Sequence, residues 1–508
     1  MRIVAGRSRI HRAGRALVPL AVLVVLLAAA QQAAAVLRVG LASAVENLDP
    51  RFATDAASTR VNRLLYARLV DFNERFEPIP DLAHWQRLSP RHYRFHLASP
   101  RRDFHDGTPL AAADVVATYR SVLDPQTGSP HRGSLHMVQR VEAPDADTVD
   151  FYLAAADALF PGRLAIGIVP GALLAAGHSF NTMPVGSGPF RFVAWPQAES
   201  VRIERLADGA EVEFQRVQKP DVRVLKLLRG ELDLLQGDMP PELLAWVARR
   251  DEVRVLRRDG TTFAYLGFNL RDPVTADVRV RRAVAHALDR EAIIRHLWAG
   301  NARPAAAVLG GDHWAGDPTL TGIAHDPDAA RRLLAQAGYG AGKRLRLVYK
   351  TSTNPVRVRI ATVIQDQLAR VGIDAEIRTY DWGTFYGDIK AGNFQVFSLA
   401  WVGIKMPDIF RYIFHSQAMP PAGANRGRWS NAEADALIER AEGASDLAEQ
   451  ARLYRELQAL ALRELPYVPL WFEDQVAVLR TGIEGYTLSR DGDFDALIDA
   501  RWQGGPAR

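Results

Sequence analysis

The segment FHDG, residues 104–107, holds the side chains that most resemble a reactive site. An imidazole beside a carboxylate can serve as a general base or a metal ligand. His105, Asp106 and Gly107 together are nevertheless typical of a turn, and the sequence offers no nucleophile or second carboxylate that would pair with them. We therefore interpret the segment as scaffold that leads into an amphipathic helix.

The segment DGDFDALID, residues 491–499, approaches a calcium-binding loop. Asp491, Asp493 and Asp495 alternate as calcium ligands do, but Ala496 stands where the sharp turn needs glycine, and no glutamate closes the loop. We therefore expect a solvated acidic turn here and no metal site.

Other familiar motifs are also incomplete. The segment AGYGAGKR, residues 337–344, lacks the first glycine and the final Ser or Thr of a phosphate loop, so it is expected to close a helix. His92 and His96 flank Arg94, whose charge disfavours a metal ion between them. Without a recognisable catalytic, cofactor or metal site, the sequence predicts that the protein is not an enzyme and needs no cofactor.

The excess positive charge of the chain lies in its first residues. The sequence has 63 Lys and Arg against 58 Asp and Glu, a formal net charge of +5. Five of the arginines fall in residues 1–35, which contain no acidic residue, so the rest of the chain is formally neutral. A nucleic-acid-binding protein would carry its basic excess on the folded body. We therefore expect no nucleic-acid partner.

Residues 1–35 have the three parts of a secretory signal peptide. An arginine-rich head precedes the apolar run ALVPLAVLVVLLAAA, and Ala33-x-Ala35 offers a cleavage site. The apolar run is shorter than the roughly 20 residues of a spanning helix and contains Pro19; the alternative is an uncleaved anchor. Because the sequence has no cysteine, lipid attachment through a thiol is excluded. We expect a soluble periplasmic protein.

The rest of the chain has the pattern of a mixed α/β fold, and 508 residues predict more than one domain. From about residue 270 to 470 helical and strand patterns alternate, which is typical of a partly parallel sheet. The predicted strands are 37–42, 92–98, 148–154, 344–349 and 373–380, and the predicted helices are 276–288, 326–338 and 357–372.

Eight segments stand out because together they form one ordered series along the chain. They are LRVGLA…LDP (37–50), EPIPDLA (77–83), FHDGTPLAAADVVATYR (104–120), PVGSGPFRF (184–192), YLGFNL (265–270), DVRVRRAVAHALDREAII (277–294), HDPDAARRLLAQAGY (325–339) and LPYVPLW (465–471). This series resembles the signature of family 5 of the extracellular solute-binding proteins, which serve peptide-type and nickel-type ABC transporters. The resemblance covers essentially the whole chain after residue 35.

The resemblance implies a periplasmic-binding-protein-like fold of type II, in its large three-domain form, with two lobes that close on a ligand cleft. Lobe I would comprise residues 36–67, 185–265 and 470–508, an accessory domain residues 68–184, and lobe II residues 266–469. The chain would cross between the lobes near residues 265–269 and 467–472, where we expect hinges.

The resemblance also implies which residues line the cleft. Peptide-binding relatives place one tryptophan at the start of a helix and a second 19 residues later; Trp382 and Trp401 have this spacing. We expect the two rings on opposing surfaces of the cleft, and the alternative is that both belong to the core. The other candidate ligand-binding residues are Tyr265, Asn269, Ser398, Val402, Gly403, Ile404, Asp408 and the segment Thr54, Asp55, Ala56, which corresponds to a strand that pairs with bound peptide.

Ile404 departs from the pattern of the peptide binders. Those relatives have an aspartate three residues after the second tryptophan, where it neutralises the α-ammonium of the ligand. An ammonium buried without a partner costs several kcal/mol, so we expect a ligand without a free α-ammonium here. Asp408 lies nearby, and Lys405 and Arg411 would favour phosphorylated sugars if they face the cleft. Peptide, opine, sugar and metal-complex ligands remain open.

The function predicted on this basis is solute capture. The protein would act as a monomer, bind a small molecule or a peptide, and deliver it to an ABC transporter permease in the inner membrane. Two alternatives remain: a ligand-binding partner of a membrane sensor, and a secreted hydrolase. A hydrolase of sugars would need two carboxylates that face the scissile bond, and the sequence does not identify such a pair.

Overall fold

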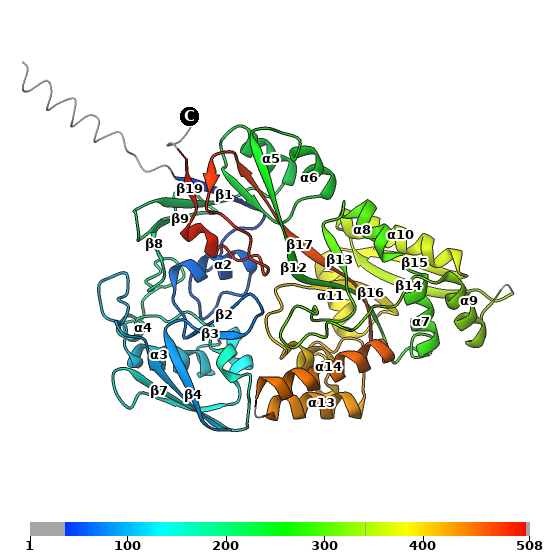
Figure 1. Cartoon of the computed structure of the whole chain (residues 1–508), viewed down its shortest axis with the longest axis horizontal. Helices are drawn as coiled ribbons and strands as arrows, with labels where there is room; N and C mark the ends of the chain where they lie inside the picture. Colours follow the sequence, from blue (N-terminus) through cyan, green and yellow to red (C-terminus); the bar gives the residue numbers. More distant parts are fainter. Residues whose placement is uncertain (1–35, 341, 445, 504–508) are drawn as a thin grey trace, which may run out of the picture.

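Two long strands connect the two halves of the molecule in the computed structural model, which describes residues 36–340, 342–444 and 446–503. The strands are β12 (Val253–Phe268) and β17 (Tyr467–Arg480), and they run between the two halves in Figure 1. We call residues 36–252 and 481–503 the left body and residues 269–466 the right body. The expected signal peptide, residues 1–35, lies outside the described residues.

The largest sheet has 11 strands and extends through both bodies. Its order is β15-β14-β16-β12-β17-β11-β1-β10-β9-β8, and β13 also pairs with β17. The remaining strands of this sheet are β1 (Leu37–Leu41), β8 (Phe190–Ala194), β9 (Ser200–Arg205), β10 (Glu211–Arg216), β11 (Leu234–Gln236), β13 (Ala302–Pro304), β14 (Leu345–Ser352), β15 (Ile373–Tyr380) and β16 (Val396–Trp401).

The two long strands change character along their length. The second half of β12, FAYLGF, and the first half of β17, YVPLWF, are continuously buried. Such strands are covered on both faces, which is why their apolar residues do not alternate with polar ones. Where they enter the left body, Asp259, Gly260 and Thr261 of β12 together oppose Asp474 alone, so the register shifts.

The right body confirms the predicted alternation of helices and strands. β14 pairs in parallel with both β15 and β16, and helices pack on both faces of this part of the sheet (Figure 1). Asp277 and Asp289 cap α7 and α8 by accepting backbone N–H groups at 2.8 Å. The helices are α7 (Val278–Ala287), α8 (Arg290–Leu297), α9 (Pro327–Gln336), α10 (Pro355–Arg370), α11 (Trp382–Ala391), α12 (Ile409–Phe414), α13 (Ala432–Gly443) and α14 (Leu447–Glu464).

The left body contains a second, smaller sheet with its own core. This four-stranded sheet has the order β4-β5-β7-β6 and packs against α3. Its elements are β4 (Ala83–Ser89), β5 (His92–Leu97), β6 (Val138–Glu142), β7 (Thr148–Leu153), α3 (Ala112–Leu123) and α4 (Gly171–Ala175), with the hairpin β2 (Val70–Phe72) and β3 (Pro78–Pro80) alongside. The other left-body elements are α2 (Ala56–Leu65), α5 (Pro220–Leu228), α6 (Pro241–Val247), β18 (Ile483–Glu484) and β19 (Arg501–Trp502).

The FHDG segment is scaffold, as predicted. The His105 ring lies 3.1 Å from the carbonyl oxygen of Gly188, and its other nitrogen accepts the N–H of Gly186. Gly107 adopts a positive φ of 85°, which favours glycine. The segment therefore ties the chain that precedes α3 to residues 186–188, which lead into β8.

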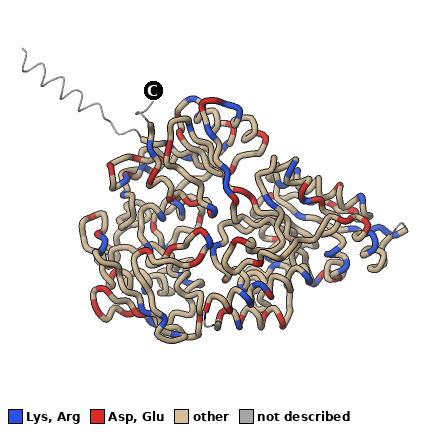
Figure 2. The backbone as a smooth tube through the Cα atoms, in the orientation of Figure 1, with Lys and Arg blue, Asp and Glu red and all other residues tan. Residues whose placement is uncertain are grey.

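Charges of both signs are distributed over the two bodies. Figure 2 shows Lys and Arg interspersed with Asp and Glu along the whole described chain, with neither body dominated by one sign. Within that part of the chain, no helix is long and apolar enough to cross a membrane.

Candidate ligand-binding site

Five side chains of the right body and of the adjoining half of β12 form one continuous row. The rings of Tyr265 and Trp401 are stacked with centroids 6.3 Å apart. The Arg426 guanidinium lies 4.5 Å from the Trp401 ring and 5.3 Å from that of Tyr386. The ring of Trp382 stacks on Tyr386 at 5.4 Å. We call these five residues the aromatic row.

Local structure explains why these side chains meet. Trp382 is the first residue of α11, which begins there because Asp381 accepts the Thr384 N–H at 3.1 Å. Tyr386 lies one turn later on the same helix and so projects from the same face. Trp401 ends β16, opposite Phe263 of β12. The helix and the two strands therefore deliver the four rings.

Exposed apolar side chains lie at the Trp382 end of the aromatic row and beside Trp401. Trp382 is 59% exposed, Val402 66% and Tyr412 47%, and Tyr412 contacts the Trp401 ring edge-on at 6.0 Å. A tryptophan as open as Trp382 is not part of the core, so the core alternative is wrong for this residue. Exposed aromatic groups of this kind favour a binding surface.

The expectation that the two tryptophans face each other from opposing surfaces is wrong. Both belong to the right body, and Arg426 and Tyr386 lie between them in the aromatic row. The reason is that the helix and the strand that carry them are neighbours in the same body, which residue spacing alone does not reveal.

Arg426 is a functional candidate that the sequence did not suggest. It is 6% exposed, and it donates to the hydroxyls of Tyr265 and Tyr386 at 3.0 Å each. Burial raises the pKa of the Tyr265 hydroxyl, so this phenol is neutral at neutral pH. The guanidinium remains positively charged, and the described residues include no carboxylate in ion-pair contact with it.

Three predicted site residues have structural partners. Tyr265 is fully buried, and its ring stacks on Phe263 and Tyr467 as well as on Trp401. The Asn269 amide donates to the carbonyls of Gly392 and Phe394 at 3.1 Å each. Ser398 accepts a hydrogen bond from the Tyr349 hydroxyl at 2.9 Å. The hydrogen bonds of Asn269 and Ser398 tie the region of β16 to the end of β12 and to β14.

The residues after Trp401 alternate between surface and core. Val402 is exposed, Gly403 has a positive φ of 65°, and Ile404 is only 7% exposed. Ile404 packs into the same apolar cluster as Phe472. The position that differs from the peptide binders is thus filled by an apolar side chain with no charge to offer.

The segment Thr54, Asp55, Ala56 is not a strand here. Asp55 accepts the Ser58 N–H at 2.8 Å, and this cap starts α2 at Ala56. Thr54 and Ala56 are exposed at the helix entrance. The local capping interaction explains why the expected strand is absent from this segment.

Each of the three charged candidates near Trp401 has an ionic partner. Asp408 pairs with Arg163 of the left body at 3.0 Å. Arg411 binds Glu442 at 2.6 Å. The Lys405 ammonium lies 2.6 Å from Asp491 and 2.7 Å from Asp493. The expected preference for phosphorylated sugars requires Lys405 or Arg411 to be free to meet the ligand. Both side chains are engaged in ion pairs, so neither supports that preference.

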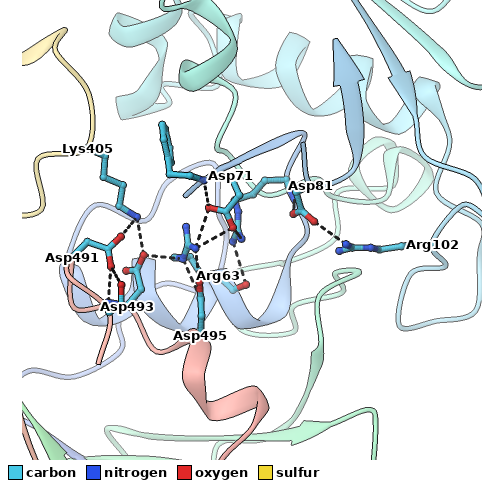
Figure 3. Close-up of polar contacts among 11 residues, drawn as sticks. Arg63, Asp71, Asp81, Arg102, Lys405, Asp491, Asp493 and Asp495 are labelled. Atoms are coloured by element: carbon cyan, nitrogen blue, oxygen red, sulfur yellow. Dashed lines mark hydrogen bonds and ion pairs between the residues drawn. The ribbon is translucent and has the colours of Figure 1, made fainter. Parts of the chain in front are cut away.

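The acidic segment 491–495 is largely a buried ion cluster, so the expected solvated turn is wrong. The Asp491 and Asp493 side chains are 10% and 8% exposed. Figure 3 shows Lys405 of the right body reaching both carboxylates, while Arg63 of α2 reaches Asp493 and Asp495. Burial alone would raise the pKa of Asp491, but the Lys405 ammonium holds it below its usual value. Cations contributed by distant segments make burial possible, and the local sequence contains no sign of them.

The cluster extends further into the left body. Arg63 also pairs with Asp71, which binds Arg68 at 2.8 Å, and Asp81 and Arg102 pair nearby (Figure 3). Among the residues that the structure describes, no group of three or more His, Asp or Glu side chains is arranged to hold a metal ion.

Comparison with known proteins shows which family the chain belongs to. Residues 77–419 match the sequence model of the bacterial extracellular solute-binding proteins, family 5. The chain belongs to this family. Its expected type II periplasmic-binding-protein fold is thereby confirmed, and so is its role as an extracytoplasmic solute-binding protein.

Relatives in the family carry the names of different solutes. The oligopeptide-binding protein AppA of Bacillus subtilis is 26% identical over 469 residues, which cover 86% of each chain. The heme-binding protein A of Haemophilus influenzae is 27% identical over 479 residues, covering 85% of this chain and 86% of the relative. The crystal structure of NikZ from Campylobacter jejuni with Ni(L-His) superposes with a TM-score of 0.77 at 22% identity and covers 92% of this chain and 99% of its own.

Proposed function

We propose that this member of family 5 captures its solute on the surface formed by the aromatic row, Val402 and Tyr412. The observation that carries the proposal is the exposure of Trp382 in a row of side chains that also contains Trp401, because the segment after Trp401 reaches the other body. Lys405 lies four residues after Trp401 and contacts Asp491 and Asp493. The exposed aromatic surface therefore adjoins the boundary between the bodies, where a ligand can lose contact with water on two sides.

We propose that the two bodies move about the register shift of the long strands. Gly260 lies within this shift, and a Cβ atom on it would come 2.2 Å from the Glu473 carbonyl oxygen. This irregular step favours a hinge at residues 259–261 and 474, slightly on the left-body side of the crossings expected from the sequence. The three-domain boundaries given above are part of the same proposal.

The proposed partners are a solute and an inner-membrane permease. Removal of residues 1–35 would release a periplasmic monomer that delivers the solute to the permease and catalyses no reaction. Three carboxylates of the right body support this, because Asp408, Glu442 and Asp388 are each paired with a cation and so lack the freedom of a general acid and base pair. Hydrolase assays on generic glycosides and peptides should give no turnover.

Native mass spectrometry of freshly purified protein tests the proposal directly. We expect a complex heavier than the mature chain by the mass of one small solute, and we expect this solute to be lost from the Trp382→Ala variant. A protein that carries no solute, and whose melting temperature responds to no member of a panel of peptides, amine-blocked peptides, opines and sugars, would contradict it. Intact mass also reports whether residues 1–35 are removed.

A further inference from the structure

The geometry points to Arg426 as the group that recognises a carboxylate of the solute, with the apolar part of the solute lying against Trp382, Val402 and Tyr412. This inference rests on the proposed function and adds the chemical class of the solute. It follows from the charge, the hydrogen-bonding capacity and the surroundings of Arg426.

The charge of Arg426 is not balanced by neighbouring acidic side chains. Asp388, on the same helix as Tyr386, pairs with Lys350 at 2.6 Å. Asp408 pairs with Arg163, and Glu442 pairs with Arg411. A buried charge normally has a partner of opposite sign. Since no carboxylate of the described residues forms an ion pair with Arg426, which instead lies among tyrosine hydroxyls, an anion that enters with the solute would supply the missing partner.

Arg426 also retains hydrogen-bonding capacity. Its guanidinium has five N–H groups, and its two side-chain hydrogen bonds go to Tyr265 and Tyr386. Tyr265 is fully buried, but Tyr386 is partly exposed, and its hydroxyl accepts from Arg426 and still has its own O–H to donate. A carboxylate can therefore receive the planar fork of the arginine, which matches its geometry, together with a phenol.

The surroundings select against a cationic group at the same place. A positive charge in a site of low dielectric repels an α-ammonium, and Ile404 offers no carboxylate to compensate. The guanidinium is held against the faces of Trp401 and Tyr386, which fixes its position without cancelling its charge. The site is thus built for an apolar or aromatic acid whose amine is absent or blocked.

Matched probes that differ only in their charge test the inference. The probes are N-acetyl-phenylalanine, N-acetyl-phenylalanine amide, phenylalanine amide and phenyl phosphate, each measured by thermal shift and by calorimetric titration. We expect wild-type protein to bind the N-acetyl acid at least about tenfold more tightly than its amide and to bind the cationic amide least. In Arg426→Gln the acid and the amide should bind within about twofold of each other, whereas Arg426→Lys should keep part of the preference.

Arg428→Gln is the matched control. It removes one positive charge two residues away, from a side chain that donates to the Ala391 carbonyl, and it should leave the preference for the acid intact. Equal binding of acid and amide by wild-type protein, preference for phenyl phosphate alone, or no response to any carboxylate probe would each overturn the inference. In all three cases the proposed function is judged separately, by whether a solute copurifies with the chain.

Discussion

Arg426 divides the aromatic row into an inner and an outer part with different environments. On the inner side, Trp401 stacks on the fully buried Tyr265. On the outer side, Tyr386 stacks on the exposed Trp382. A large ring held in place but open to solvent offers contact area at a small entropic cost. At the scale of single residues, the proposed function therefore gives Trp382 a role in binding alone and Trp401 a role in both binding and stability.

The two tryptophans should respond differently to truncation. Trp382→Ala should weaken solute binding by about 2 kcal/mol, roughly thirtyfold, with no change in melting temperature, because its ring is mostly exposed. Trp401→Ala should weaken binding by a similar amount and also lower the melting temperature, because its ring packs on Tyr265. Titration calorimetry and thermal unfolding measure the two effects.

A control for these variants lies in the left body. Trp246→Ala removes a ring that is 40% exposed and contacts Arg250, and it should leave affinity unchanged. Full affinity in both Trp382→Ala and Trp401→Ala would show that the aromatic row is not the binding surface.

Asp474 should make stability depend on pH. Burial and the neighbouring carboxylate of Asp259 raise the pKa of Asp474 to about 6, above the value near 3.9 of an unfolded chain. The folded state therefore binds this proton more tightly than the unfolded chain does. The stabilisation that the proton provides is complete below about pH 4 and is lost as the pH rises through 6. Since Asp474 is only half-buried, we expect on the order of 1 kcal/mol.

Urea unfolding at pH 4.5 and 7.5 measures this contribution. Asp474→Asn should be more stable than the wild type at pH 7.5 and should lose less stability across the interval. Asp259→Asn should give a smaller change in the same direction, because it removes the like charge. An unchanged pH dependence in Asp474→Asn would show that this carboxyl titrates normally.

At the scale of elements, the sequence predicted most of what local interactions decide. The helices capped by Asp277 and Asp326 begin close to their predicted starts, because each cap lies beside the helix it starts. The failures involve partners distant in sequence. The segment around Asp493 is buried because Lys405 and Arg63 reach it, and Arg426 gains its position from rings on three other segments.

The candidate site was predicted in part for the same reason. The family resemblance marked Trp382, Trp401 and Tyr265 of the aromatic row and Val402 beside it, since a family pattern records spacing along the chain. It did not mark Arg426 or Tyr386, whose roles depend on a contact between a loop and a helix 40 residues apart. Nothing in the sequence around Arg426, which lies between Asn425 and Gly427, distinguishes it from an arginine that is exposed to solvent.

The register shift of the long strands should depend on Gly260. A Cβ atom at this position would lie 2.2 Å from the Glu473 carbonyl oxygen, which is fixed by strand pairing. Gly260→Ala should therefore lower the free energy of unfolding by about 1–3 kcal/mol. Gly443→Ala, at a helix end where a Cβ atom meets nothing within 4 Å, should have little effect in the same thermal unfolding assay. Equal stability of the two variants would show that the hinge region yields without strain.

At the scale of the whole molecule, contacts between the bodies hold the present arrangement. Lys405 binds Asp491 and Asp493, Arg163 binds Asp408, and Arg490 binds Asp312. Each of these ion pairs joins the left body to the right body, so opening the two bodies would separate the partners. A ligand can shift the balance between open and closed forms only by binding one form more tightly.

A substitution of Lys405 tests most directly whether these ion pairs control closure of the two bodies. Lys405→Met leaves two carboxylates of the cluster without their ammonium, and removing one partner of a buried pair is typically destabilising by about 3–5 kcal/mol. The partial exposure of Lys405 reduces that figure, and opening the bodies would let water reach the carboxylates. We therefore expect the variant to open, with a larger radius of gyration in solution scattering and weaker solute binding, while saturating solute restores the compact form.

Lys405→Arg, which keeps the charge, should behave like the wild type. If the scattering curve of Lys405→Met matches that of the wild type with and without solute, the ion cluster does not control closure, and the two strands at residues 259–261 and 474 must set the angle between the bodies alone.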